Sequence, residues 1–206
     1  MGERLLRGLA GLLVVTLLAG CGGGGPEEGD LAGAVLDEPY VVPDTRLTDT
    51  DSEPYSLTAD TDARLTLVFF GYTHCPDICQ VVMSSLASAM TRLPEADRDE
   101  VDVVFVTTDP ARDDEKVLRT YLDRFDPTFV GLTGALDRIT AVGADLGIAV
   151  EKGEKLPSGG YEVIHSTPVV GIDADDRVPI VWTEGTSAAE FAADVHTLLT
   201  GEVAGA

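Results

Sequence analysis

Two continuous apolar runs mark the centre of the chain, and a segment with helical periodicity follows each. The runs span residues 65–70 and 101–107. Apolar runs of this length without alternation are typical of strands buried on both faces of a parallel sheet. Apolar residues then recur at helical spacing to about Leu93 and again over 113–125. This order predicts a βαβα arrangement and therefore a parallel sheet.

The remaining pattern completes one α/β domain. From residue 40 onward we expect a short hairpin around a polar turn (40–57), a short strand or extended link (129–132), a helix (136–146), a long exposed hairpin or loop (148–163), an antiparallel hairpin (169–182) and a closing helix (187–199). This succession predicts a thioredoxin-like fold with an N-terminal β-hairpin and one inserted helix. Residues that follow the parallel strands should meet at one sheet edge, where α/β sites usually form.

The N-terminal residues have the features of a targeting segment. Arg4 and Arg7 precede an apolar stretch that is too short to span a bilayer and is typical of a signal peptide. It ends in Leu-Ala-Gly-Cys21, which resembles a bacterial lipobox with a lipidated cysteine. We expect a signal peptide (1–20), a lipid-anchored flexible tether (21–38) and a thioredoxin-like domain (39–206). The protein would sit on the extracytoplasmic face of the bacterial cell membrane. The alternative is ordinary secretory cleavage with an incidental cysteine.

The formal net charge of −22 at pH 7 narrows the range of partners. Such a surface repels nucleic-acid phosphates and anionic lipid headgroups, and it favours solubility and cationic partners or counterions. We therefore expect no nucleic-acid partner. An acidity that merely suits the medium outside the cell is the simpler alternative to a dedicated binding surface.

Cys75 and Cys79 directly follow the first buried run. With Cys21 lipidated they are the two cysteines left for the folded part, so no disulfide framework is expected. We predict a helix with Cys75 at its N-cap, with Pro76 and Asp77 in its first turn and both thiols on one face. A helix N-terminus lowers the pKa of a thiol, and the thiolate attacks disulfides or binds soft metals. An oxidising compartment would join the pair unless it is kept reduced or metallated.

A copper ion held by two thiolates needs a third ligand, and imidazole is the favoured supplier. His165 is the best candidate because it stands on the loop leading into the hairpin strand, and in a thioredoxin-like fold that loop faces the cysteine helix. His74 adjoins Cys75 and is better placed to tune its thiolate than to bind metal. His196 lies among apolar residues of the closing helix, where we expect a structural or surface role.

Three segments resemble the Sco/SenC family of copper-binding assembly factors for cytochrome c oxidase. They are residues 69–79 (FFGYTHCPDIC), 105–113 and 161–166, and the resemblance covers about 40–200. It implies that Cys75, Cys79 and His165 bind one copper ion, Cu(I) or Cu(II). It also implies that the protein passes copper to the copper A centre of cytochrome c oxidase subunit II, or reduces that centre's cysteines. Another periplasmic copper chaperone is a further candidate partner, and we expect a monomer.

Two carboxylates and a proline need separate treatment. Asp77 could stabilise the helix start or orient a ligand, and Asp109 resembles the family's aspartate after the second parallel strand. Capping or turn roles explain either residue equally well, and neither is predicted to bind the metal. Thr167-Pro168 departs from the family pattern and matches the cis peptide that thioredoxin-like oxidoreductases place opposite their cysteines. A cis bond at Pro168 would favour dithiol exchange.

Four functions compete. A copper metallochaperone needs only binding, whereas a thiol-disulfide oxidoreductase would use Cys75 as the attacking and Cys79 as the resolving thiol. Three residues between the cysteines, instead of two, disfavour the oxidoreductase. A peroxidase of this fold would need a Thr-x-x-Cys arrangement, which Tyr72 to Cys75 fits poorly. A purely structural disulfide is disfavoured because a core of this size needs no staple within one helical turn.

Overall fold

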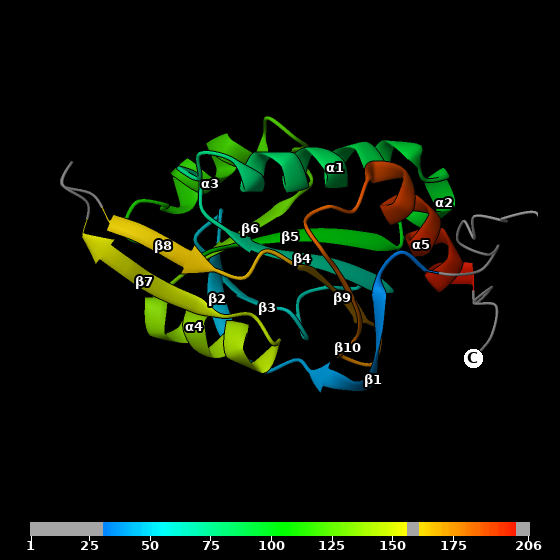
Figure 1. Cartoon of the computed structure of the whole chain (residues 1–206), viewed down its shortest axis with the longest axis horizontal. Helices are drawn as coiled ribbons and strands as arrows, with labels where there is room; N and C mark the ends of the chain where they lie inside the picture. Colours follow the sequence, from blue (N-terminus) through cyan, green and yellow to red (C-terminus); the bar gives the residue numbers. More distant parts are fainter. Residues whose placement is uncertain (1–30, 156–160, 201–206) are drawn as a thin grey trace, which may run out of the picture.

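A computed structural model describes residues 31–155 and 161–200, and an eight-stranded mixed sheet forms its centre (Figure 1). The strand order is β1-β10-β9-β4-β5-β6-β2-β3. These strands are β1 (Ala34–Val41), β2 (Arg46–Asp49), β3 (Pro54–Ser56), β4 (Leu65–Gly71), β5 (Val101–Thr107), β6 (Val130–Thr133), β9 (Val169–Asp173) and β10 (Arg177–Trp182). A separate two-stranded sheet consists of β7 (Val150–Lys155) and β8 (Tyr161–His165). The helices are α1 (Ile78–Arg92), α2 (Glu95–Arg98), α3 (Glu115–Leu122), α4 (Leu136–Asp145) and α5 (Ala188–Thr200).

The predicted parallel unit forms the middle of the sheet. β4 runs parallel to β5, and β5 runs parallel to β6, while β9 pairs with β4 in the antiparallel direction. Gly71 at the end of β4 lies opposite Thr107 at the end of β5. The segments that follow these two strands therefore start side by side, as the sequence predicts for a site at this edge. The thioredoxin-like α/β architecture is confirmed.

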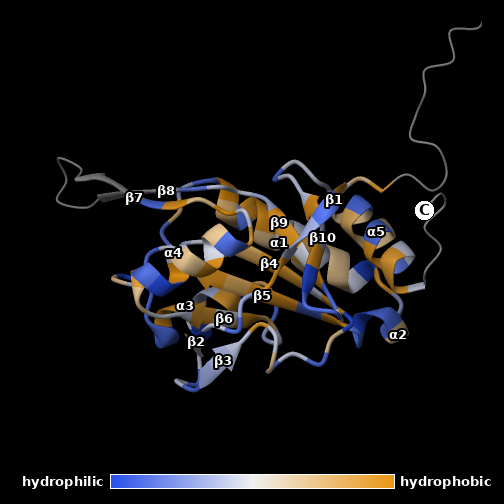
Figure 2. Cartoon of the chain, turned by 90° about the horizontal axis from the view of Figure 1, so that it is seen from below, coloured by the Kyte–Doolittle hydropathy of each residue, from blue (hydrophilic) through white to orange (hydrophobic). Residues whose placement is uncertain are grey.

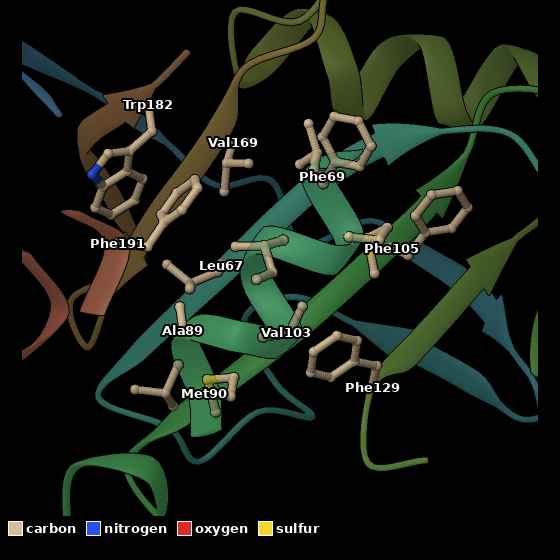
Figure 3. Packing of buried hydrophobic residues seen from close by; sticks show 14 of the residues in the cluster. Leu67, Phe69, Ala89, Met90, Val103, Phe105, Phe129, Val169, Trp182 and Phe191 are labelled. Atoms are coloured by element: carbon tan, nitrogen blue, oxygen red, sulfur yellow. The ribbon is translucent and has the colours of Figure 1, made fainter. Parts of the chain in front are cut away.

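Alternation along the central strands creates two cores, one on each face of the sheet. Leu67 and Phe69 of β4 pack on the face covered by α1, α3 and α5, whereas Val68 and Phe70 pack on the face covered by α4. Figure 3 shows the first core, in which Phe69, Phe105 and Phe129 belong to the same cluster as Ala89 and Met90 of α1. β4 and β5 are hydrophobic along their length (Figure 2), which explains their lack of alternation in the sequence.

The folded part begins ahead of residue 39, the boundary expected from the sequence. Residues 34–41 form β1, which pairs with β10, so the hairpin predicted over 40–57 is limited to β2 and β3. A buried carboxylate fixes this N-terminal segment. Asp194 of α5 accepts hydrogen bonds from the backbone amides of Ala32 (3.1 Å) and Gly33 (2.9 Å) and from Nε1 of Trp182 (2.7 Å). Residues 31–38 therefore belong to the domain and not to a tether.

The predicted signal peptide and the lipidation site at Cys21 lie outside the described residues. Within 31–155 and 161–200, no helix is long and apolar enough to cross a bilayer.

Candidate metal centre

The two thiols lie in the short connection between β4 and α1 and in the first turn of α1. Cys75 is 7% exposed and Cys79 is fully buried, and both are free thiols. The amide of Cys75 donates to the carbonyl of Tyr72 (3.1 Å), which closes a turn ahead of the helix. The helix starts at Ile78 with Asp77 as its N-cap, so the prediction of Cys75 as the N-cap was wrong. Cys75 therefore approaches the site from a turn, and Cys79 from the first helical turn.

Gly71 makes room for the buried sulfur. A Cβ at this position would lie 2.9 Å from Cε2 of Phe105 and 3.0 Å from Sγ of Cys79. Real Cβ atoms rarely approach so closely in a packed core. The glycine thus lets the end of β4 pass directly over Cys79 and the ring of Phe105.

Burial dominates the acidity of Cys79. Loss of solvation raises the pKa of the Cys79 thiol well above its ordinary value, and the nearby Cys75 side chain raises it further. The backbone amides of Tyr72 and Cys79 act in the opposite direction. The lowered pKa expected from the helix N-terminus is therefore wrong for Cys79. Because metals bind the thiolate, a soft cation has to displace a proton from this sulfur.

His165 lies at the end of β8 with its ring directed at Cys79. Nε2 is 4.0 Å from Sγ of Cys79, and Nδ1 is 2.9 Å from the carbonyl oxygen of Ser166. A carbonyl only accepts, so Nδ1 carries the proton and Nε2 keeps its lone pair. Burial also lowers the pKa of His165, which keeps the imidazole neutral at pH 7. This is the tautomer that binds a metal through Nε2.

Two aromatic rings hold the imidazole in place. Tyr72 contacts His165 edge-on with ring centroids 5.9 Å apart, and Phe69 does so at 6.4 Å. The guanidinium of Arg112 lies 6.0 Å from the Tyr72 ring centroid. Tyr72 received no role from the sequence, although it stands between the buried strand and the cysteines. Its position explains how the imidazole at the end of β8 is aligned with the end of β4.

Asp113 is a second residue that sequence reasoning missed. Its carboxylate is fully buried and accepts hydrogen bonds from the amide (2.8 Å) and hydroxyl (2.6 Å) of Thr73 and from the hydroxyl of Thr107 (2.8 Å). Thr73 stands two residues before Cys75. Asp113 therefore connects the turn that carries Cys75 to the end of β5. The signal in the sequence that could have revealed this role is the position of Asp113 shortly after the second parallel strand.

The two carboxylates named from the sequence lie elsewhere. Asp109 is buried and pairs with Arg112, and its amide donates to the hydroxyl of Thr107 (3.0 Å). Its carbonyl accepts a hydrogen bond from the amide of Asp113 (3.0 Å), and both aspartates also contact the hydroxyl of Thr107. The side chain of Asp77 is exposed and makes no capping hydrogen bond.

The other histidines and Pro168 are also placed. Nδ1 of His74 lies 3.0 Å from the hydroxyl of Thr73 and 3.6 Å from Oδ1 of Asp113, and its side chain is largely exposed. His196 pairs with Asp97 (2.6 Å) at the far end of α5, which agrees with a surface role. The Thr167–Pro168 bond is trans, since the described backbone contains no cis peptide.

The model of the SCO1/SenC family matches residues 35–200, which include the thiol pair, His165 and the whole sheet. The chain belongs to the SCO1/SenC family.

Relatives of this SCO1/SenC protein include bacterial and mitochondrial proteins. A putative copper-binding protein of Stutzerimonas stutzeri is 33% identical over 145 residues, covering 69% of this chain and 70% of that protein. The mitochondrial SCO2 homolog of Danio rerio is 36% identical over 53% of this chain, and the match spans only 39% of its own length.

Solved structures of the family share the fold. The apo Sco1 protein of Thermus thermophilus is 27% identical with a TM-score of 0.75, and 84% of this chain matches 99% of that one. ScoI of Bradyrhizobium japonicum, solved with copper bound, is 28% identical with a TM-score of 0.66, and 78% of this chain matches 98% of it.

The donor set of this SCO1/SenC protein fits a soft cation. Two atoms that bind one small ion through bonds of about 2.0–2.3 Å lie about 3.5–3.8 Å apart, close to the Cys79–His165 separation. In the described ranges, however, no group of three or more His, Cys, Asp or Glu side chains is positioned to hold a metal ion. Metal binding by Cys75, Cys79 and His165 thus requires side-chain rotation from the arrangement seen.

Proposed function

We propose that this SCO1/SenC protein is a copper metallochaperone that binds one copper ion through Cys75, Cys79 and His165. One observation carries the proposal, namely the Nε2 lone pair of a neutral, aromatic-packed imidazole 4.0 Å from the buried sulfur of a reduced cysteine pair. Two sulfurs and one nitrogen suit Cu(I) in trigonal coordination, whereas structural zinc would need a fourth protein ligand.

The cellular role we propose is assistance in assembling the copper A centre of cytochrome c oxidase subunit II. Support comes from the copper-binding name of the Stutzerimonas stutzeri relative and from the copper-bound ScoI structure. We also propose that lipid at Cys21 anchors the protein to the extracytoplasmic face of the membrane. Labelling with a fatty acid tests the anchor, which Cys21→Ala should abolish; label retained by the variant would contradict it.

The residues around the thiols have separable tasks in this function. Bound copper supplies a cation that replaces the thiol protons. Tyr72 and Phe69 hold the His165 ring in its orientation, and the carbonyl of Ser166 fixes its tautomer. Asp113 holds the turn that carries Cys75. Transfer to a partner would need thiolates of that partner to replace Cys75, Cys79 and His165 as ligands.

Copper titration of the reduced full chain tests the ligand set, and His196→Ala provides a matched control. We expect one copper per wild-type chain and an absorption band from thiolate to Cu(II). His165→Ala should lose the band and most of the copper affinity because Nε2 is a ligand, while His196→Ala should retain both because its ring pairs with Asp97. Identical titrations for His165→Ala and wild type would remove His165 from the ligand set.

A thiol-disulfide oxidoreductase is the second candidate function. The observation that favours it is the contact between two reduced cysteines of unequal exposure, Cys75 being the more accessible. In that case Cys75 attacks a target disulfide, and Cys79 then displaces the target's thiol. Turnover of a disulfide substrate by copper-free protein, lost in Cys75→Ser and unaffected by His165→Ala, would establish this activity.

A further inference from the structure

A surface cavity of about 560 Å³ lies next to the turn that carries Cys75. Thr73 and His74 of that turn form part of its wall, and residues between Asp114 and Arg124, from α3 and its two ends, form the rest. Thr73 and His74 directly precede Cys75, so this wall leads to the more exposed of the two thiols. Cavities of about 300–1,000 Å³ are typical of sites for small molecules.

The charge of the cavity wall differs from that of the chain as a whole. The sequence contains 36 acidic and 14 basic residues, whereas the wall holds two cations, Lys116 and Arg124, and one exposed carboxylate, Asp114. Oδ1 of Asp114 already accepts a hydrogen bond from the amide of Val117 (2.8 Å) as the N-cap of α3. The cavity is therefore a locally cationic site on an acidic protein.

The donors of this wall are available to a ligand. Within the described residues, neither Lys116 nor Arg124 forms an ion pair. Nε of Arg124 donates to the carbonyl of Tyr121 (3.3 Å), and its guanidinium lies 4.8 Å from the Tyr121 ring centroid, which holds the cation against the wall. The hydroxyl of Tyr121 is buried and has no hydrogen-bond partner in the described part of the chain. Because buried polar groups are normally satisfied, this wall lacks an acceptor.

A carboxylate is the acceptor that these donors favour. Arginine and lysine side chains bind carboxylates through charge-assisted hydrogen bonds. A small molecule with its carboxylate in the cavity has its other end near the turn that carries Cys75, where a thiol on that molecule can react with Cys75. An oxidising compartment would join Cys75 to Cys79, and copper binds the reduced pair, so such a thiol has a task at this place.

We propose that this cavity binds the carboxylate of a small thiol that reduces the Cys75–Cys79 disulfide. The proposal rests on the proposed function, because copper binding needs the reduced pair. The thiolate of one molecule attacks Sγ of Cys75, the bond to Cys79 breaks, and Cys79 takes up a proton.

A second molecule completes the reduction. Its thiolate attacks the first molecule's sulfur in the mixed disulfide, which releases Cys75 as a thiol and forms a small-molecule disulfide. Two electrons pass from the two small thiols to the protein, and the two thiol protons end on Cys75 and Cys79.

Two thiols that differ in one group test the proposal. 3-Mercaptopropionate carries a carboxylate where 3-mercaptopropanol carries a neutral hydroxymethyl group. The rate of reduction by each is measured on the oxidised full chain with Cys21→Ala, so that Cys75 and Cys79 are its only cysteines. Reduction of a neutral disulfide in solution corrects for the intrinsic reactivity of each thiol.

A double variant, Lys116→Gln with Arg124→Gln, removes the two cations of the wall. The matched control is Arg64→Gln with Arg138→Gln, which removes two exposed arginines, one before the start of β4 and one on α4 at the other face of the sheet. Both double variants change the net charge equally, so a difference between them comes from the position of the charges.

The wild type should react faster with the carboxylate thiol than with the neutral one, and the rate should saturate as the carboxylate thiol fills the cavity. The net charge of −22 alone predicts the opposite order, because it repels an anion. Loss of Lys116 and Arg124 should lower the corrected preference for the carboxylate about 5-fold, the effect of losing two exposed ion pairs. The control double variant should keep the preference.

Three results would overturn the proposal. They are a corrected rate with the carboxylate thiol that is equal to or slower than the neutral one, an unchanged preference after loss of Lys116 and Arg124, and failure of the oxidised chain to form the Cys75–Cys79 disulfide. None of these measurements needs copper. A chain that shows the carboxylate preference but binds no copper once reduced would reject the proposed function and support the cavity as a thiol subsite.

Discussion

The two ends of the β4–β5 pair use the same structural device for different purposes. At the start of the strands, the hydroxyl of Thr61 donates to Asp102 (2.7 Å) and lies 3.1 Å from the hydroxyl of Thr66. At the end of the strands, the carboxylate of Asp113 accepts hydrogen bonds from Thr73 and Thr107. Each aspartate ties the segment flanking β4 to β5.

The difference lies in what the tied segment carries. Thr61 belongs to an oxygen-rich connection next to Tyr55, Asp60 and Asp102. Thr73 belongs to the turn that presents Cys75, and His165 approaches the same place from β8. Both thiols and His165 lie at the end of β4 and β5, where the Asp113 hydrogen bonds hold the turn that carries Cys75. The hydrogen bonds therefore supply rigidity, and the residues beside them supply the chemistry.

The largest expected effect comes from removing a sulfur. Cys75→Ser or Cys79→Ser should weaken copper binding by more than the roughly 10- to 100-fold that follows loss of an orienting group, because a ligand itself is lost. Equilibrium copper competition measures the loss. Thr61→Ser at the opposite end keeps its hydroxyl and should bind copper like the wild type. A copper-free cysteine variant that fails to fold would instead favour a structural role for the pair.

The two aspartates provide the direct test of the comparison. Asp113→Ala leaves an amide and two hydroxyls without their acceptor, and we expect it to lower the free energy of unfolding by about 3 kcal/mol. Asp102→Ala removes the acceptor of one hydroxyl at a less buried position and should cost about 1 kcal/mol. Urea denaturation gives both values.

Asp113→Ala and Asp102→Ala should also differ in copper affinity. Asp113→Ala should bind copper more weakly because the Cys75 turn is released, while Asp102→Ala should bind it normally. Equal copper affinities in the two variants would mean that the tie at Asp113 is structural only, as at the other end.

Lowering the pH should reduce the stability of the protein through His165, at the end of the sheet that carries the thiols. The pKa of His165 is lowered by burial below the ordinary 6.5, so the unfolded chain takes up a proton before the folded one does as the pH falls. The contribution of His165 to the free energy of unfolding is therefore complete above pH 6.5. It is lost as the pH falls through the pKa that His165 has in the folded protein. Copper-free wild type should therefore lose more stability between pH 7.5 and 5.5 than His165→Gln. Parallel pH curves for the two proteins would contradict a neutral, buried His165.

Raising the pH should reduce stability by a smaller amount through Tyr55, near the start of β4 and β5. Burial, with added repulsion from Asp102, raises the pKa of Tyr55 from 10.0 to about 12. Its contribution to stability is complete below pH 10 and is lost as the pH rises toward 12. Tyr55→Phe should remove this part of the alkaline loss in melting experiments, whereas Tyr40→Phe, at an exposed position, should not. Loss of equal size in all three proteins would locate the titrating group elsewhere.

The sequence predicted the architecture well because its signals are local. The apolar runs of β4 and β5 and the periodicity of the helices depend on neighbouring residues, and they gave the correct order of elements. The start of α1 was misjudged because Pro76 and Asp77 suit a first helical turn. The turn closed by Cys75 and Tyr72 delays the helix to Ile78.

The missed features depend on partners far away in the chain. Residues 22–30 have the Gly, Pro and acidic composition of a tether, and the expected tether extends this segment to residue 38. The pairing of β1 with β10 and the hydrogen bond from Gly33 to Asp194, 161 residues away, show that residues 31–38 are part of the fold. Asp109 and Asp113 look alike in the sequence. Which of them turns toward Thr73 is decided by how the chain leaves β5, and the pattern of residues does not encode that direction locally.

The separate sheet of β7 and β8 has a mechanical consequence. His165 belongs to this hairpin, whereas the thiols belong to the central layer, and the two sheets share no strand pairing. Two-stranded hairpins are marginally stable by themselves. A single ion bonded to Cys79 and His165 would join the hairpin to the central sheet. Copper binding, if it occurs as proposed, would therefore restrict the motion of β8 relative to the end of β4.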